Sequence, residues 1–272
     1  MRQALRSGRA SRTAEAVCFL RGLAGVDPYA GELLGPIARV ALARPMALPL
    51  LNLASGTLLA SIAARTRFID EVVEAGLAGG AVRLVLLGAG LDARPWRFAP
   101  RLGDRPVYLV DHPASAENRA RRSRTLPTRP QDVRIDVDFA RDDLRARLRS
   151  AGLTPGSPSV FVWEGVSMYL PEAAVRQTLA DIAALAGPGS LLAFDLWSDE
   201  GAFGRASHAV GALGLGLLGE PLRSTCHADA VGPLLADAGF ALDTLSDTAT
   251  WARKAAVGVG HPRLLLARAS RS

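Results

Sequence analysis

Residues 83–97 read RLVLLGAGLDARPWR, a short apolar run that breaks into Gly88-Ala89-Gly90. An apolar run without polar alternation is typical of a parallel strand that is buried on both faces. Glycines directly after such a strand let the backbone turn sharply and approach a ligand, because no Cβ stands in the way. A glycine pair after a hydrophobic run is common, so a ligand site here needs support from the rest of the chain.

Strands and helices alternate along the chain after this glycine loop. Strands are expected at 83–87, 106–110, 132–136, 159–163 and 190–195, and helices at 114–124, 141–150, 171–185 and 228–238. Residues 240–245 and 263–268 are expected to close the pattern as an antiparallel edge. Repeated strand–helix units predict an α/β fold, with a mostly parallel, seven-stranded sheet and helices on both faces.

The N-terminal part of the chain is expected to be helical. Residues 11–24 show helical spacing of apolar side chains, and residues 30–78 are interpreted as three helices broken near Pro45 and at Gly56. One uncharged stretch, 46–64, is about long enough to cross a bilayer. Polar and helix-breaking residues interrupt it, so we interpret it as a buried pair of helices and expect no membrane span.

These patterns divide the chain into two parts. Residues 1–78 would form an N-terminal helical lid, and residues 79–272 a ligand-binding α/β domain with a glycine-rich insertion at about 199–224. A lid of this kind closes over a bound ligand and excludes water from it.

The chain carries a formal charge of +6, and nearly all of its positive charge is arginine. The densest basic patch is ENRARRSR at 117–124, with Arg119, Arg121, Arg122 and Arg124. No aromatic residue interleaves with it, so it lacks the stacking platforms that bind nucleic acids. We interpret it as the solvated face of a helix and expect no nucleic-acid partner.

Cysteine and histidine usage favours neither a metal site nor a disulfide. Cys18 and Cys226 lie far apart in the sequence, and the four histidines are dispersed. The N-terminus is basic but has no apolar core and no cleavage site, so a signal peptide is not expected. A cytoplasmic protein with free thiols is expected, and its oligomeric state is not indicated.

Acidic residues follow four of the expected strands. Asp92 lies just beyond the first strand, Asp111 ends the second, Asp138 follows the third and Glu164 ends the fourth. The carboxyl ends of parallel strands lie at one edge of the sheet, where ligands bind in open α/β folds. Each acid also has a structural alternative, as a helix cap, a strand-end cap or a turn residue.

The spacing from the glycine loop to Asp111 is about 20 residues, the distance at which a carboxylate grips a ribose diol. This fits an adenosine-containing cofactor, either NAD or S-adenosylmethionine. Asp92 would stand beside the pyrophosphate of NAD, and two anions at one helix N-terminus repel each other. S-adenosylmethionine has no phosphate and carries a sulfonium and an ammonium, so the acids favour it.

Several motifs occur in a characteristic order. LLGAGLDARPWR, VYLVDHP, VDFARDDL and FVWEGVSMYLPEAAV, preceded by SRTAEAV, DPYA and AARTRFIDE, resemble the leucine carboxyl methyltransferase family. Its bacterial branch comprises O-methyltransferases associated with polyketide and other natural-product pathways. The resemblance covers most of residues 11–195 and implies a Rossmann-like class I methyltransferase that binds S-adenosylmethionine.

The resemblance also implies roles for individual residues. An arginine holds a carboxylate well because its guanidinium offers two parallel donors. The family pattern places Arg65 and Thr13 at the carboxylate of the methionine moiety, and Gly88 and Gly90 against the rest of that moiety. It places Asp111 at the ribose hydroxyls, and Asp138 and the backbone of Phe139 at the adenine. Glu164 would face the ammonium or the substrate mouth. The alternative for Arg65 is a helix-surface arginine paired with Asp70 or Glu71.

The expected reaction is methylation of a carboxylate, or of a hydroxyl, on a lipophilic small-molecule natural product. An ionised carboxylate needs no general base, so in-line positioning of the reacting atoms would supply the catalysis. Tyr169 is a candidate for orienting the acceptor. A phenol acceptor would need a base, and His112, His208 and His227 are the candidates near the expected rim. The apolar walls expected for the acceptor are Phe19, Leu50, Leu51, Leu53 and the 209–218 stretch.

Two other functions fit a similar sheet. An NAD-dependent oxidoreductase would need a catalytic Tyr/Lys pair, but Lys254 is the only lysine and comes late in the chain. A cofactor-binding protein without methyl transfer would keep the fold and lose the chemistry. The acceptor itself is not indicated, because the residues of 199–224 that would contact it cannot be assigned.

Overall fold

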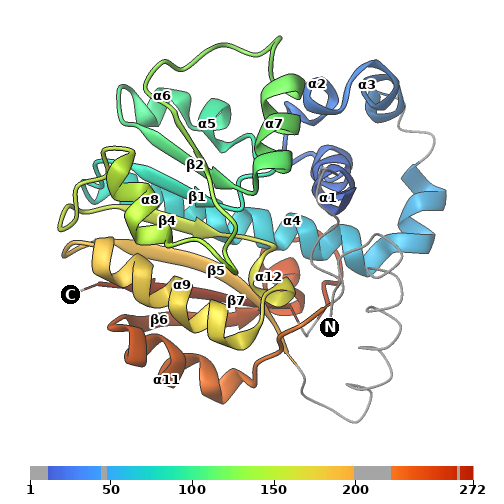
Figure 1. The fold of residues 1–272 in the computed structure, drawn as a ribbon. Helices are drawn as coiled ribbons and strands as arrows, with labels where there is room; N and C mark the ends of the chain where they lie inside the picture. The colour runs from blue at the N-terminus through green and yellow to red at the C-terminus, as the bar shows by residue number, and fades with distance from the viewer. Residues whose placement is uncertain (1–11, 44–47, 199–221, 262–263, 272) are drawn as a thin grey trace.

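The structure of the protein, a computed structural model, describes residues 12–43, 48–198, 222–261 and 264–271 (Figure 1). Its seven strands form one sheet in the order β3-β2-β1-β4-β5-β7-β6. Their bounds are β1 Leu84–Leu87, β2 Val107–Asp111, β3 Val133–Asp136, β4 Val160–Trp163, β5 Leu191–Trp197, β6 Ala241–Asp247 and β7 Leu264–Ser270. The expected seven-stranded α/β fold is confirmed.

The first five strands are parallel, and β7 runs antiparallel to both β5 and β6. Strand β1 lies between β2 and β4, so the strand order reverses beside it. In its register, Leu87 is level with Val110 of β2 and Trp163 of β4. The residues that follow these three positions therefore leave the sheet side by side, at the point where open α/β sheets bind ligands.

Helices cover both faces of the sheet (Figure 1). One core cluster joins the sheet to α8 (Leu144–Ser150), α9 (Glu172–Leu185) and α11 (Ala228–Ala238). A second cluster, on the opposite face, joins it to α4 (Leu48–Ala78), α6 (Ala99–Leu102) and α12 (Thr248–Lys254). Strand β1 is buried along its whole length because both layers cover it.

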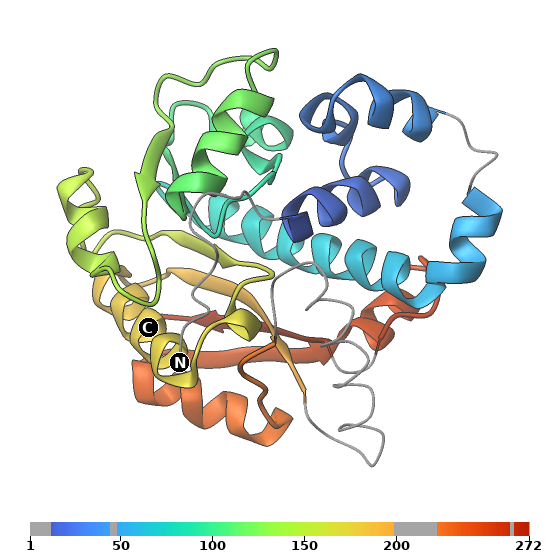
Figure 2. The same cartoon turned by 45° about the vertical axis from the view of Figure 1, so that its right-hand side comes forward.

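Three helices precede α4 and pack at the ligand-binding edge (Figure 2). They are α1 (Arg12–Leu23), α2 (Ala30–Leu34) and α3 (Pro36–Ala43). A small core joins Cys18 and Leu33 of this layer to Leu91 and Ala93, which follow β1. The N-terminal helices are thus anchored on the segment after the glycine loop, while the division at residue 78 stays a prediction.

Helix α4 differs from its expected form. Gly56 does not end a helix, because α4 runs without interruption from Leu48 to Ala78. One glycine costs a helix only about 1 kcal/mol, less than the packing of the following turns contributes. The break falls instead at Gly35, which has φ +94° and is followed by Pro36, a residue that restricts the conformation before it.

Three short helices were not expected from the sequence: α5 (Arg94–Arg97), α6 and α12. They span one or two turns, too short for a helical period to stand out. Of the expected insertion, residues 199–221 lie outside the described residues. Among the described residues, no helix has the length and apolarity needed to cross a bilayer.

Candidate functional site

The glycine loop turns directly off the end of β1. Gly88 has φ +73°, and a Cβ on it would overlap the side chain of Val166. The Gly90 N–H donates to the Asp111 carboxylate at 2.6 Å, and the His112 N–H donates to the other oxygen at 2.7 Å. Asp111 is therefore held against the glycine loop by two backbone donors.

No arginine neutralises Asp111 at contact distance among the ion pairs of the described residues. Burial raises its pKa to about 6, against the hydrogen bonds from Gly90 and His112. The carboxylate borders a cavity of about 180 Å³ that Trp96 and Arg119 also line. A carboxylate without a cationic partner is stabilised in its ionised form by further neutral hydrogen-bond donors, and the two hydroxyls of a ribose are such donors.

Arg119 of α7 (Pro113–Arg122) holds the glycine loop from the other side. Its Nη1 donates to the Gly90 carbonyl at 3.0 Å, and its guanidinium lies 4.9 Å from the ring centre of Trp96. Arg119 is only 6% exposed, so the expectation of a solvated basic patch at 117–124 is wrong for this residue. Both polar groups of the Gly90 backbone are thus bonded, one to Asp111 and one to Arg119.

A second carboxylate, Glu164, follows β4 and meets three arginines. Its Oε1 lies 2.5 Å from Arg21 Nη2 and 2.8 Å from Arg65 Nε, and its Oε2 lies 2.7 Å from Arg94 Nη1. Burial alone would raise the pKa of Glu164, but Arg21, Arg94 and Arg65 hold it well below its usual range. Glu164 is therefore ionised throughout the physiological range.

Asp195 on β5 extends this group of charges. Its carboxylate accepts from Arg65 Nη1 at 2.8 Å and from the Gly165 N–H at 2.7 Å. Burial raises the pKa of Asp195 and Arg65 opposes the shift. Asp195 thus fixes the guanidinium of Arg65 and the backbone just after Glu164.

Arg94 connects Glu164 to the outer acids. It is fully buried and pairs with Asp92 at 2.5 Å and with Asp70 at 2.8 Å, and Arg97 pairs with Asp70 from the surface side. We call these residues the ion-pair cluster: Arg21, Arg65, Asp70, Asp92, Arg94, Arg97, Glu164 and Asp195. Its four guanidinium groups balance its four carboxylates, which is what allows so many charges to be buried together.

Helix α4 brings Arg65 to this edge of the sheet. A helix rises about 1.5 Å per residue, so Arg65 lies about 20 Å from Ala78, where α4 ends before β1. That distance is close to the length of β1 and the residues that lead into it. Arg65 pairs with Glu164 and Asp195 and not with Asp70 or Glu71, so the alternative of a helix-surface arginine is wrong.

Helix α1 forms a wall of the site. A Cβ on Gly90 would lie 3.4 Å from the Ala14 Cβ, so α1 packs close to the glycine loop. Two polar atoms on this helix are buried and have no hydrogen-bond partner, Thr13 Oγ1 and Arg21 Nε. Orphaned polar atoms are uncommon in protein interiors and call for an explanation, such as a ligand.

The remaining predicted residues lie at the same edge but outside these contacts. Asp138 accepts from the Ala140 N–H, and its own N–H donates to Asp142, as a turn residue does. The ring of Phe139 lies 6.5 Å from that of Trp163. Tyr169 packs in a small apolar cluster with Met168, Leu222, Leu264 and Trp197. Their expected roles stay predictions.

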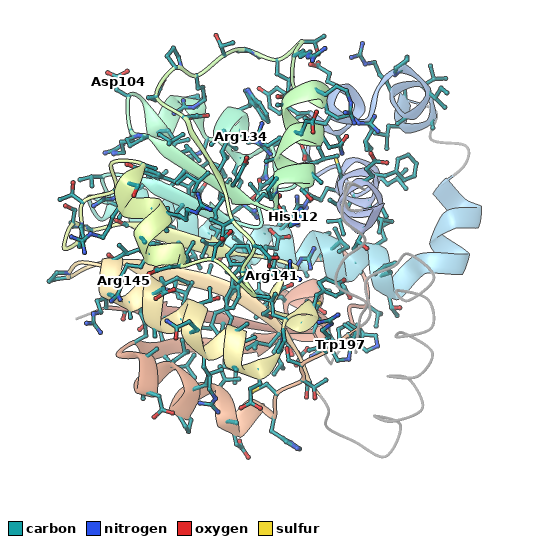
Figure 3. The ribbon with its side chains drawn as sticks, viewed as in Figure 1. Asp104, His112, Arg134, Arg141, Arg145 and Trp197 are labelled. Atoms are coloured by element: carbon teal, nitrogen blue, oxygen red, sulfur yellow. The ribbon has the colours of Figure 1, made fainter. Side chains whose placement is uncertain are left out.

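The histidines considered as bases hold structural positions where the structure describes them. His112 precedes α7, and its Nδ1 accepts from the Ala114 N–H at 3.4 Å (Figure 3). His227 is the residue that precedes α11. His208 and the 209–218 stretch lie outside the described residues, as do the side chains of Leu50, Leu51 and Leu53.

Six members of the site were not assigned to it from the sequence: Arg21, Asp70, Arg94, Arg97, Arg119 and Asp195. Arg21 lies eight residues after Thr13, a spacing that places both on one side of a helix. Asp195 lies within β5, but the acids counted at the sheet edge stopped at the fourth strand. Arg94 gave no usable signal and Arg119 was interpreted as solvated, since a buried arginine is recognised only from the carboxylates or carbonyls around it.

Solved structures with this fold include methyltransferases. A DUF574 family protein from Streptomyces avermitilis matches 94% of this chain and 97% of its own, with a TM-score of 0.64 and 16% identity. Magnesium protoporphyrin IX methyltransferase from Synechocystis PCC 6803, solved with bound SAH, matches 78% of this chain and 86% of its own, with a TM-score of 0.52 and 16% identity. The fold is the Rossmann-like α/β fold of class I methyltransferases.

The sequence profile of the leucine carboxyl methyltransferase family matches residues 24–183. The match covers more than half of the chain, including the glycine loop, Asp111 and Glu164. The protein belongs to the leucine carboxyl methyltransferase family.

Two curated bacterial relatives are provisionally named S-adenosyl-L-methionine-dependent methyltransferases. The relative from Mycolicibacterium smegmatis is 37% identical over 179 residues, which is 61% of this chain and 58% of that protein. The relative from Streptomyces coelicolor is 36% identical over 140 residues, which is 51% of this chain and 49% of that protein. The chain thus spans about half the length of the curated relatives it matches.

Proposed function

We propose that the protein is an S-adenosylmethionine-dependent O-methyltransferase that acts on a carboxylate, or a hydroxyl, of a lipophilic small molecule. The observation that carries this proposal is Asp111, a partly buried carboxylate bonded to Gly90 of the glycine loop at 2.6 Å. It stands where a ribose diol would meet the sheet edge. The names of the bacterial relatives and the family membership give independent support.

The other end of the site suits an amino acid. A carboxylate needs buried cationic donors, and Arg21 and Arg65 supply them. An ammonium needs a buried anion, and Glu164 supplies one. Thr13 Oγ1 and Arg21 Nε are buried without a hydrogen-bond partner, and a polar ligand group would supply one.

The arrangement suits methyl transfer by positioning. When bound, S-adenosylmethionine supplies an electrophilic methyl group, which an acceptor oxygen attacks in line as the C–S bond breaks and its electron pair goes to sulfur. The protein's part is to hold the two ends of the cofactor, through Asp111 at one and Glu164 with its arginines at the other. Well-oriented reactants gain up to roughly 7–11 kcal/mol over reactants free in solution.

An apolar acceptor is supported by the surface beside α4. An open hollow of about 510 Å³ is lined by Ala24, Thr57, Leu59, Ala60, Ala63 and Val257–Val259. Ala60 and Ala63 lie within two turns of Arg65 on the same helix. Charged side chains are absent from this lining, so a lipophilic molecule fits it better than a charged peptide.

Calorimetric titration tests the proposal. The protein is titrated with S-adenosylmethionine, with its demethylated product S-adenosylhomocysteine and with NAD, and the Asp111→Asn variant is titrated alongside. Micromolar binding of the first two ligands, weakened at least about 100-fold in the variant, is expected, because the ribose loses its charged acceptor.

Two results would contradict the proposal. Binding of NAD alone would assign the site to an oxidoreductase. Tight binding of S-adenosylmethionine with no methylation of any acceptor in a carboxylate and phenol panel would favour a cofactor-binding protein without methyl transfer.

A further inference from the structure

Arg119 is a buried cation without an anionic partner. It is 6% exposed, and no carboxylate in the part of the chain that the structure describes lies within ion-pair distance of it. Its Nη2 is buried with no hydrogen-bond partner, and burial lowers the pKa of the guanidinium. A buried charge without a counter-ion is costly, because it loses its hydration and gains no ion pair in return. The position of Arg119 therefore points to a role beyond packing.

The glycine loop separates Arg119 from Asp111. Arg119 Nη1 donates to the Gly90 carbonyl at 3.0 Å and to the Ala89 carbonyl at 3.5 Å, and the Gly90 N–H donates to Asp111 at 2.6 Å. The Ala89 carbonyl and the Gly90 N–H belong to one peptide group, which thus has the cation at its oxygen and the anion at its N–H. Hydrogen bonds in such a chain are charge-assisted and polarise one another, so each becomes stronger.

Arg119 and Asp111 line the same cavity of about 180 Å³ without forming an ion pair. A direct ion pair would occupy the carboxylate lone pairs that a ribose diol needs. Burial raises the pKa of Asp111, and the positive charge of Arg119 is one of the groups that oppose this shift. Arg119 therefore stabilises the ionised carboxylate from behind the loop and leaves its oxygens accessible to a ligand.

The other charged groups around Asp111 have partners of their own. These ion pairs are Asp92–Arg94 at 2.5 Å, Asp132–Arg129 at 3.0 Å and Asp136–Arg134 at 2.9 Å. Burial raises the pKa of the Cys18 thiol to about 12, so Cys18 stays neutral. His112, the residue after Asp111, accepts from the Ala114 N–H. Among the described residues at the glycine loop, Arg119 is thus the cation whose charge no ion pair balances.

We propose that Arg119 is a positioning residue for the adenosine end of the cofactor site. It holds the glycine loop in the conformation that directs the Gly90 N–H at Asp111, and it supplies the positive charge that keeps this carboxylate an acceptor for the ribose hydroxyls. Trp96 supports the guanidinium from the other side, with its ring centre at 4.9 Å. This inference rests on the proposed function, in which Asp111 meets a ribose.

The test uses 5′-methylthioadenosine, which keeps the adenosine and the thioether of the cofactor but lacks its amino-acid end. We measure its affinity by calorimetry between pH 5 and pH 9. For the wild-type protein the affinity should fall as the pH drops through about 6, where Asp111 takes up a proton. In Arg119→Gln the midpoint of this fall should move up by about 1 pH unit, because Asp111 loses its nearby cation.

The same variant should also lose affinity at high pH, where Asp111 is ionised. At pH 9, Arg119→Gln should bind 5′-methylthioadenosine on the order of 10-fold more weakly, since the loop loses hydrogen bonds from a charged donor. Arg119→Lys keeps the charge but not the planar fork of donors. Its midpoint should return to that of the wild-type protein, while its affinity at pH 9 stays about threefold weaker.

Arg121→Gln is the matched control. Arg121 lies on the same helix, is exposed and bonds Asn118 at 2.6 Å, so this variant removes one positive charge from α7 without touching the glycine loop. Its pH profile should equal that of the wild-type protein. His112 is present in every variant, so it does not contribute to the differences between their midpoints. Arg119→Met, which fills a similar space without charge, replaces Arg119→Gln if that variant does not fold, and the same shift is expected.

The outcomes separate the inference from the proposed function. An unchanged midpoint in the neutral Arg119 variant, or an equal shift in Arg121→Gln, would overturn the inference and leave the proposed function standing. Failure of the wild-type protein to bind both 5′-methylthioadenosine and S-adenosylhomocysteine would overturn both. A shift that is confined to the neutral Arg119 variant and reversed in Arg119→Lys supports the positioning role.

Discussion

Asp111 is a partly buried carboxylate and Glu164 a buried one, and both lie beside β1 where their strands end, but the groups around them differ. Asp111 is bonded by two backbone N–H groups, and burial raises its pKa to about 6. Glu164 lies between three arginines, which hold its pKa well below the usual range. Burial penalises both charges, but only Glu164 receives full compensation from the protein.

Under the proposed function, this difference suits the two sites to chemically different ends of one ligand. A site with surplus negative charge gains from neutral hydroxyl donors and rejects other anions. The two sites are joined by the glycine loop, whose Gly90 is bonded to Asp111 and packs against α1.

The largest expected effect is on stability at the Glu164 end. Glu164→Gln leaves Arg21, Arg65 and Arg94 without their shared carboxylate and should lower the free energy of unfolding by about 3–5 kcal/mol. Chemical denaturation at neutral pH measures it. Asp111→Asn removes the same charge at the other end and should change that free energy by less than about 1 kcal/mol. Equal losses in the two variants would contradict the difference in charge compensation between Glu164 and Asp111.

The raised pKa of Asp111 explains why Asp111→Asn should change the free energy of unfolding only a little. The pKa of Asp111 in the folded protein lies above the usual value of 3.8 for aspartate. The folded state therefore holds this proton more tightly than the unfolded chain does, so Asp111 lowers the free energy of unfolding as the pH rises from about 3.8 to about 6, and above that range the loss is complete. At neutral pH the variant loses one hydrogen bond but is relieved of this loss of stability.

The next largest expected effect is a change of ligand affinity with pH. Only ionised Asp111 accepts both ribose hydroxyls, so binding of 5′-methylthioadenosine should weaken about tenfold between pH 8 and pH 5, as Asp111 takes up a proton. This ligand has no amino-acid end, so the profile reports the Asp111 end alone. A flat profile for the wild-type protein would contradict the pKa shift, and Asp111→Asn should give a flat profile.

The smallest effect concerns Thr13. Its Oγ1 is buried without a partner, so the near-isosteric Thr13→Val variant removes an unsatisfied polar group and should be at least as stable as wild type. If the hydroxyl meets the amino-acid end, S-adenosylhomocysteine should bind about three- to tenfold more weakly, with 5′-methylthioadenosine unchanged. Loss of both ligands alike would place Thr13 at the adenosine end and not beside Arg21.

The order of elements could be predicted from the sequence because strand composition and helix periodicity are local signals. The five parallel strands, the antiparallel edge and the positions of Asp111 and Glu164 relative to the glycine loop were all predicted. The break at Gly35 was missed because a glycine is tolerated or disruptive according to its backbone conformation. The residue type alone does not determine that conformation, φ +94°.

The partners of the arginines could not be predicted, for a different reason. Arg21 and Glu164 are 143 residues apart, and Arg65 and Asp195 are 130 apart. Such pairs depend on the packing of α1 and α4 against the sheet edge. This packing produces no periodic pattern of residues in the sequence. The family resemblance supplied Arg65 and Glu164 as site residues, whereas their mutual pairing came only from the structure.

The position of β7 in the sheet has a consequence for the order in which the site is completed. β7 is the last of the seven strands along the chain, but it lies between β5 and β6, with Leu266 opposite Asp195. During synthesis, the glycine loop and Asp111 are made early, while β5 keeps an open edge until residues 264–270 have emerged. The strand that carries Asp195, a partner of Arg65, is therefore enclosed in the sheet only after β7 has been made, later than the glycine loop and Asp111.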